Sequence, residues 1–162
     1  MKVQLDRIDA ALIRELQGNA RLSNKELAAR VGLAPSSCLE RVRKLQQNGV
    51  LRGYHAEVDP AALGVELGAL ISIRLRRHSR DQVEGFQSFL LSLPEVSAVC
   101  YLAGPTNFMI QVGVRDANHL RDLILEQFST REEVEHIETS IIFEHAQRWV
   151  LPDYSGAKGE SD

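Results

Sequence analysis

Apolar residues among the first fifty positions recur at intervals of three and four, the spacing that places them on one face of a helix. This pattern predicts helices over residues 6–18, 23–32 and 35–48, with Asp6 and Asp9 as start signals of the first and Gly18 as its stop. The expected apolar faces are Ile8, Leu12, Ile13 and Leu16 in the first helix, Leu27, Ala28 and Val31 in the second, and Leu39, Val42 and Leu45 in the third. The N-terminal part of the chain is therefore predicted to be a small helical domain.

The second and third predicted helices are joined by a turn at Gly32, a residue that allows a positive φ. The run Ser23-Asn24-Lys25-Glu26 is a capping box, and Pro35 suits the first turn of the third helix. The outward face of that helix combines small hydroxyls with charges: Ser36, Ser37, Glu40, Arg41, Arg43 and Lys44. This pattern is typical of a helix-turn-helix whose second helix enters the DNA major groove. The alternative is a three-helix bundle with a solvated basic face.

Residues 50–58 alternate like a strand, which is compatible with a wing or with a strand leading out of the domain. Pro60 and Gly64 then interrupt the pattern, so the domain boundary is expected within 59–66. The predicted organisation is a DNA-binding domain over 1–58, a linker over 59–66, a second domain over 67–150 and a C-terminal tail over 151–162.

The second domain alternates strand and helix patterns in the order βαββαβ. The expected core positions are Ala69, Ile71, Ile73 and Leu75; Val83, Phe86, Phe89, Leu90 and Leu93; Ala98, Cys100 and Leu102; Ile110, Val112 and Val114; Leu120, Leu123, Ile124 and Phe128; and Ile137, Thr139, Ile141 and Phe143. This order is typical of a ferredoxin-like domain, in which both helices cover one face of a four-stranded antiparallel sheet. The whole chain is thus predicted to be an α+β protein.

The other face of this sheet is expected to carry Leu70, Ser72, Val99, Tyr101, Met109, Gln111 and Ile142. Because such a surface is too apolar to stay bare in water, the pattern predicts that the domain dimerises, either face to face or through its strands, and that the whole protein is a dimer.

The net charge of −3 at pH 7 argues at first against a nucleic-acid partner, but the charge is unevenly distributed. Residues 1–58 carry ten Lys and Arg against six Asp and Glu, a net charge of +4, whereas residues 59–162 carry nine against sixteen, a net charge of −7. A basic N-terminal half and an acidic remainder indicate that the first half is the part that meets DNA.

Catalytic and metal-binding patterns are not evident in the sequence. The five histidines lack metal-ligand spacing, and there is no nucleophile elbow, phosphate loop or obvious carboxylate pair. Cys38 and Cys100 are too few for a disulfide scaffold, and no apolar run is long enough to cross a membrane. The expectation is a protein that is not an enzyme, holds no cofactor or metal and does not enter a membrane.

Several motifs resemble the Lrp/AsnC (feast/famine) family of transcription regulators. They are Leu5-Asp6-Arg7-Ile8-Asp9, Ser23-Asn24-Lys25-Glu26-Leu27-Ala28, Val31-Gly32-Leu33, the run from Pro35 to Leu45, Gly53-Tyr54 and Asp59-Pro60. The resemblance implies a winged helix-turn-helix that binds double-stranded DNA, joined to a ferredoxin-like domain that binds a small effector, often an amino acid. It also implies dimers that assemble into octamers, and a cytoplasmic, nucleoid-associated location.

Carried onto this sequence, the resemblance places the DNA-reading helix at about 35–48. It implies groove and backbone contacts from Ser36, Ser37, Arg41 and Arg43, phosphate contacts from Lys44 and Arg52, and a packing role for Cys38. Glu40 is expected to orient Arg43 or Lys44.

The effector site departs from the family pattern, in which the turn after the second strand resembles Gly-Asp-x-Asp-Tyr. Here it reads Gly104-Pro105-Thr106-Asn107-Phe108, without the acids and without the phenol hydroxyl. The resemblance implies effector contacts from Leu102, Gly104, Thr106, Asn107, Phe108 and Glu138. The alternatives are a plain hairpin turn in an architectural DNA-wrapping protein without effector, and a tetrapyrrole-binding enzyme similar to the sirohaem decarboxylases.

Overall fold

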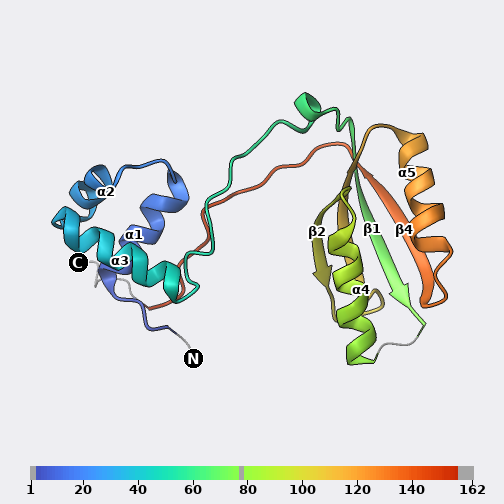
Figure 1. Ribbon diagram of the computed structural model, residues 1–162, viewed down its shortest axis with the longest axis horizontal. Coiled ribbons are helices and arrows are strands. Elements are labelled where there is room, and N and C mark those ends of the chain that lie inside the picture. The colour runs from blue at the N-terminus through green and yellow to red at the C-terminus, as the bar shows by residue number, and fades with distance from the viewer. Residues whose placement is uncertain (1–2, 77–78, 157–162) are drawn as a thin grey trace. The chain divides into compact units, whose positions relative to one another are not determined.

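The computed structural model describes residues 3–76 and 79–156 and divides the chain into two units (Figure 1). The first unit comprises residues up to Ala56 together with those from Ala146 onward, and the second runs from Glu57 to His145. The elements are α1 (Arg7–Gly18), α2 (Asn24–Val31), α3 (Pro35–Gln47), the 3-10 turn η1 (Pro60–Leu63), β1 (Leu67–Leu75), α4 (Arg80–Ser92), β2 (Val96–Tyr101), β3 (Phe108–Val114), α5 (Ala117–Leu123), the π-helical turn η2 (Ile124–Ser129) and β4 (Val134–Ile142).

The three helices of the first unit begin and end where the capping residues require. Asp6 and Asp9 form a capping box at the start of α1, and Ser23 and Glu26 form another at the start of α2. Gly32 ends α2 with a φ of 69°, which a residue with a side chain rarely adopts. The buried core of the unit consists of Leu12, Leu16, Leu27, Ala28, Cys38 and Leu45.

The strand expected over residues 50–58 is not formed, so this prediction is wrong. Residues 52–59 have no regular secondary structure, and the described part of the first unit contains no strand with which they pair. An isolated strand leaves its N–H and C=O groups without partners, and the alternating pattern alone does not supply any. The N-terminal unit is a helix-turn-helix without a wing in its described residues.

The residues after Ala146 lie with the first unit rather than with the sheet domain. The Leu151 backbone N–H donates to Gln17 Oε1 of α1 at 2.8 Å. The first residue of the predicted tail over 151–162 is thus bonded to the C-terminal end of α1. Residues 157–162 lie outside the described residues.

The second unit is a four-stranded antiparallel sheet with strand order β2-β3-β1-β4. One face carries the buried residues Ala69, Ile71, Ile73, Phe108, Ile110 and Val112, which pack against Phe86 and Leu90 of α4, Leu120 and Leu123 of α5, and Phe128 of η2. Both helices therefore cover the same face, and the predicted βαββαβ fold is confirmed.

The other face of the sheet, here termed the open face, differs from the prediction at its β2 edge. The β2–β3 register shifts between Val96 and Ala98, and Val99 consequently pairs with buried Ile110 while Cys100 pairs with Met109. Tyr101, half exposed, pairs with core residue Phe108 and contacts its ring. The register assigns the following residues to the open face: Leu70, Ser72, Arg74, Ala98, Cys100, Met109, Gln111, His136, Glu138, Ser140 and Ile142.

Candidate functional site

The start of α3, the second helix of the helix-turn-helix, is fixed by the helix before it. Asn24 Nδ2 donates to the Pro35 carbonyl oxygen at 2.8 Å, which joins the first turn of α2 to the first turn of α3. Ala34, the N-cap residue of α3, has no side chain that could cap the helix. The hydrogen bond from Asn24 therefore holds the start of α3 against α2. The family motif contained Asn24, but only its contact reveals this role.

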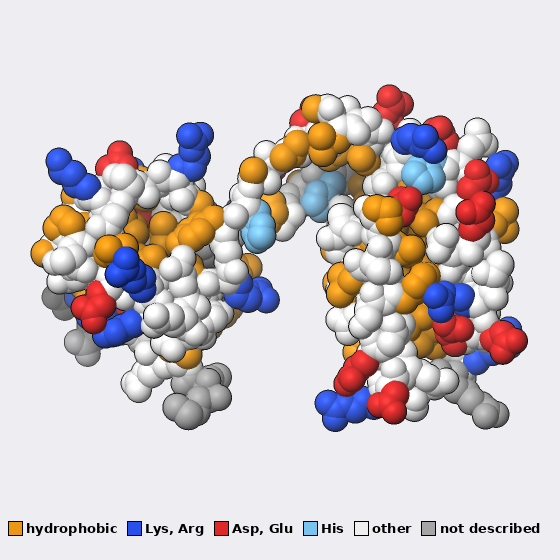
Figure 2. Space-filling model, viewed as in Figure 1, with side chains coloured by type: hydrophobic (Ala, Val, Ile, Leu, Met, Phe, Trp, Pro, Cys, Tyr) orange, Lys and Arg blue, Asp and Glu red, His pale blue; other side chains and the backbone are white. Residues whose placement is uncertain are grey.

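The outward surface of α3 carries hydroxyls at its N-terminal end and cations farther along. Ser36, Ser37, Arg43 and Lys44 are all exposed, as is Arg52 beyond the helix. Among the described residues, neither Arg43 nor Arg52 forms an ion pair, so both positive charges remain available to phosphate. In the view of Figure 2, blue Lys and Arg side chains prevail over red ones on the helical unit, while the two colours are interspersed on the sheet unit.

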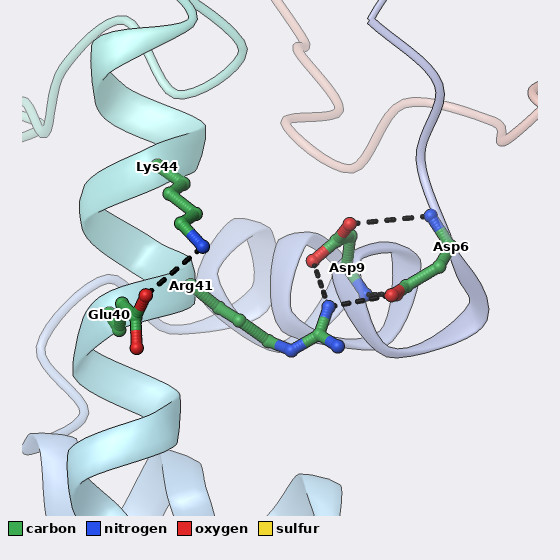
Figure 3. Close-up of polar contacts among 5 residues, drawn as sticks. All are labelled: Asp6, Asp9, Glu40, Arg41 and Lys44. Atoms are coloured by element: carbon green, nitrogen blue, oxygen red, sulfur yellow. Dashed lines mark hydrogen bonds and ion pairs between the residues drawn. The ribbon is translucent and has the colours of Figure 1, made fainter.

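Glu40 orients one of these cations. Its carboxylate Oε1 lies 3.0 Å from Lys44 Nζ, one helical turn along α3 (Figure 3). Both side chains are about two-thirds exposed, so the pair holds Lys44 weakly and leaves it free to exchange partners.

Arg41 borders this surface, in a hollow that Ser37 and Lys44 also line, but its guanidinium is bonded to another helix. Its Nη1 donates to Asp6 Oδ2 at 2.6 Å and to Asp9 Oδ1 at 2.9 Å, both at the start of α1 (Figure 3). The structure therefore brings Ser36, Ser37, Arg43 and Lys44 together on α3 but places the Arg41 guanidinium against α1.

Leu39 is a surface residue that the apolar pattern did not reveal. It was expected in the core of the third helix, but it is 39% exposed and is absent from the residues packed in the core of the first unit. The buried position is the neighbouring Cys38, with no exposed area, and desolvation raises the pKa of its thiol. An exposed Leu between Ser36 and Arg43 adds an apolar side chain to the outward surface of α3, and apolar side chains of this kind can contact a thymine methyl group.

The second candidate site is the turn between β2 and β3. The Leu102 N–H donates to the Asn107 carbonyl at 2.8 Å and closes the turn, in which Gly104 adopts a φ of 141°. Asn107 is buried, and its Oδ1 accepts the Leu75 backbone N–H at 2.8 Å. Phe108 is fully buried in the core. Leu102, Asn107 and Phe108 thus build the turn, and Asn107 Oδ1 and the Phe108 ring do not face solvent.

A hollow of about 190 Å³ lies beside this turn, over the β1 and β4 strands. Its lining residues are Ser72, Arg74, Pro105, Thr106, His136 and Glu138. Ser72 pairs with Glu138 and Arg74 with His136 across the two strands, so the register places these four side chains at adjacent positions of the open face. The hollow includes Thr106 and Glu138 of the predicted effector residues.

The hollow offers both signs of charge. Glu138 Oε1 lies 3.2 Å from His136 Nε2, and Arg74 Nε lies 3.1 Å from Glu135 Oε2. A guanidinium and a carboxylate in one hollow suit a zwitterion, because each end of the ligand meets an opposite charge. Sequence reasoning missed Arg74 and His136, which only the β1–β4 register identifies.

Over residues 3–76 and 79–156, no group of three or more His, Cys, Asp or Glu side chains is placed to hold a metal ion. Within the same residues, the helices are too short or too polar to span a bilayer.

Two family comparisons match most of the chain. Residues 5–46 match the AsnC-type helix-turn-helix domain, and residues 68–148 match the Lrp/AsnC ligand binding domain. The first match contains α1, α2 and nearly all of α3, and the second contains β2, β3, β4 and all of β1 except Leu67.

Curated relatives and solved structures agree with these matches. The chain is 40% identical to the HTH-type transcriptional regulator AldR of Mycolicibacterium smegmatis, over 87% of this chain and 82% of that protein. It is 35% identical to the leucine-responsive regulatory protein of Rhizobium meliloti, over 87% and 90% of the two chains. It is similar to the crystal structure of a transcriptional regulator from Neisseria meningitidis in complex with L-Met, with a TM-score of 0.80, 31% identity and coverage of 91% and 96%.

Proposed function

The chain belongs to the Lrp/AsnC family of DNA-binding transcriptional regulators, and from this premise we propose that it is a sequence-specific regulator tuned by a small-molecule effector. The observation that carries the DNA-binding part is the exposed hydroxyl and cationic surface of α3, tied by Asn24 to the helix before it. The protein acts on nucleoid DNA in the cytoplasm.

The proposed docking places α3 in the major groove. Ser36 and Ser37, at the N-terminal end of the helix, meet base edges and nearby backbone, and Arg43 contacts the groove or its backbone. Lys44 and Arg52 contact phosphates, and Lys44 leaves its exposed pair with Glu40 to do so.

Salt dependence tests this docking. We expect weaker DNA binding from each of three variants, Arg43→Ala, Lys44→Ala and Arg52→Ala. Each should also make the negative slope of log K against log salt concentration shallower by about 1. Arg80→Ala on α4 is the matched control, because it removes an exposed, ion-paired arginine from the other unit. If the three variants kept the parental slope, this face of α3 would not be the DNA-binding surface.

The effector is proposed to be an amino acid or a related zwitterionic metabolite, bound in the hollow beside the β2–β3 turn. Arg74 pairs with the carboxylate of the effector, and Glu138 pairs with its ammonium group. Thr106 and the Gly104 backbone supply neutral hydrogen bonds. Support comes from the charges in the hollow and from the L-Met complex of the Neisseria meningitidis regulator.

A thermal-shift screen over the twenty amino acids tests the effector proposal. At least one is expected to raise the melting temperature, and Glu138→Gln is expected to abolish that shift, because the ammonium group loses its counter-charge. Glu84→Gln on α4 is the matched control and is expected to keep the shift. Silence across the whole set would instead favour an architectural DNA-wrapping protein.

The protein is further proposed to form a homodimer that assembles into an octamer. The open face supports this assembly, since it combines Leu70, Cys100, Met109 and Ile142 on one side of the sheet, whose helices cover only the other side.

A further inference from the structure

The start of α1 holds two carboxylates that each serve two partners. Asp6 Oδ1 accepts the Asp9 backbone N–H at 2.8 Å, and Asp9 Oδ2 accepts the Asp6 backbone N–H at 3.3 Å, which together form the capping box. The remaining oxygen of each carboxylate accepts from Arg41 Nη1 (Figure 3). One arginine of α3 is therefore bonded to both halves of the cap of α1.

The helical repeat places Arg41 at the border between the buried and the exposed faces of α3. Residues three and four apart share a helix face, so Arg41 has buried Cys38 and Leu45 on one side and exposed Ser37 and Lys44 on the other. Cys38 and Leu45 are 0% and 3% exposed, and the Arg41 side chain is 35% exposed. Arg43, in contrast, is exposed and falls on the outward side.

The charge of this cluster also separates Arg41 from phosphate. Two carboxylates and one guanidinium leave one net negative charge, which repels a DNA backbone. Hydrogen bonds from the Asp9 backbone and from Arg41 hold the pKa of Asp6 below its ordinary value, so the carboxylate stays ionised near neutral pH. The same two carboxylates raise the pKa of Arg41.

We propose that Arg41 is a positioning residue that sets the orientation of α3 against the capped end of α1, and that it makes no DNA contact. This inference replaces the direct contact expected from the sequence, and it rests on the proposed docking of α3 in the major groove. By fixing the helix, the clamp of Arg41 with Asp6 and Asp9 fixes which base edges Ser36 and Ser37 reach.

Arg41→Ala tests the proposal through two readouts that a phosphate contact and a positioning role move differently. The ratio of operator affinity to bulk-DNA affinity is expected to fall about fivefold, while the salt slope stays at the parental value. The measurements are made on full-length protein below the melting temperature of the variant, so that loss of folding does not enter. A slope lowered by about 1, with the ratio unchanged, would show a phosphate contact and overturn the proposal.

Asp9→Asn gives a second test that does not depend on Arg41→Ala folding. Asp9 is 17% exposed at its side chain, and its amide analogue keeps the shape while weakening the clamp. The affinity ratio is expected to fall in the same direction as in Arg41→Ala, and the double variant is expected to be no worse than Arg41→Ala alone. If the acids instead held Arg41 back from DNA, Asp9→Asn would release it, strengthen DNA binding and steepen the salt slope.

Glu15→Gln is the matched control for the loss of an acid. Glu15 pairs with Arg30 of α2 at 2.8 Å. Its replacement by Gln removes one negative charge from the same unit, as Asp9→Asn does, without removing a contact to α3. It is expected to leave the affinity ratio unchanged. If Arg43→Ala and Lys44→Ala did not alter the salt slope, the proposed docking of α3 would be refuted. If they do alter it, the affinity ratios and salt slopes of Arg41→Ala and Asp9→Asn decide the role of Arg41.

Discussion

At the scale of single residues, neighbouring positions of α3 have opposite environments. Cys38 is fully buried and Leu39 is 39% exposed, although leucine is the more apolar side chain. The reason is geometric, because the turn of the helix brings Cys38, Val42 and Leu45 toward the core and leaves Leu39 on the exposed side. Which apolar residue is buried therefore depends on helix orientation as well as on side-chain chemistry.

The stability of two leucine variants should differ accordingly. Leu45→Ala is expected to lower the free energy of unfolding by about 2–5 kcal/mol, because it opens a cavity at a position that is 3% exposed. Leu39→Ala is expected to cost less than about 1 kcal/mol. Urea unfolding followed by the fluorescence of Trp149, which belongs to the first unit, measures both. Equal losses would place Leu39 in the core.

The ionisation of Asp6 predicts an acid dependence of the first unit. Its pKa is lower in the folded protein than its ordinary value of 3.8, so the folded state binds this proton less readily than the unfolded chain. The stabilisation is fully present above about pH 3.8 and is lost as the pH falls through the lower folded pKa.

In Asp6→Asn, the urea midpoint should fall less between pH 5 and pH 3 than in the parent. Some dependence will remain, because the pKa of Glu26 is lowered too, chiefly by the Ser23 hydroxyl. Ser23→Ala is the complementary variant, since it removes the hydroxyl bonded to Glu26 and leaves the Asp6 cap intact. An unchanged pH profile in Asp6→Asn would contradict the assignment.

At the scale of elements, the turn between α2 and α3 depends on backbone conformation rather than on packing. A Cβ atom added at Gly32 would meet no atom within 4 Å, yet the residue has a φ of 69°. The cost of a side chain there is therefore the cost of the left-handed conformation alone.

Gly32→Ala is expected to lower the free energy of unfolding by roughly 1–2 kcal/mol and to weaken DNA binding as the turn deforms. Gly18→Ala is the control, because Gly18 ends α1, does not require a positive φ and also has open space around it. That variant should be neutral or slightly stabilising, since alanine reduces the freedom of the unfolded chain. Comparable losses in the two variants would refute this account of the turn.

At the scale of the whole molecule, the open face is the surface that the fold leaves uncovered. The helices α4 and α5 and the turn η2 protect one side of the sheet, while Met109 and Cys100 lie side by side on the other. The proposed dimer buries the apolar residues of this face, Leu70, Cys100, Met109 and Ile142, which explains why a domain with a well-packed core keeps apolar residues on its second side.

Met109→Asp is expected to shift the protein toward monomer in analytical ultracentrifugation, because a charge in the buried interface lacks a partner. Leu63→Asp in η1 is the control, since Leu63 is 71% exposed and lies outside the sheet. Cys100 should react slowly with a thiol reagent in the assembled protein and faster in Met109→Asp, while Cys38 stays unreactive in both. An unchanged oligomeric state would exclude the open face as the interface.

The sequence by itself determined the elements of the fold and their order. Capping residues such as Ser23 and Glu26 and the stop at Gly32 act through neighbours a few positions away, so local pattern was sufficient for α1, α2 and α3. The alternation over 50–58 was equally local but misled, because a strand also needs a partner elsewhere in the chain.

Only the tertiary structure distinguishes the residues of the candidate sites from one another. Arg41 and Arg43 look alike in sequence, and only the contact of Arg41 with Asp6 and Asp9, more than thirty residues away, separates the arginine bonded to α1 from the exposed one. In the same way, the β1–β4 register brings Arg74 and His136 beside Glu138, and the shift in β2 exchanges Val99 for Cys100 on the open face. Local free energies fix which helices and strands form, whereas the partner that each side chain meets depends on long-range packing that no short window of sequence contains.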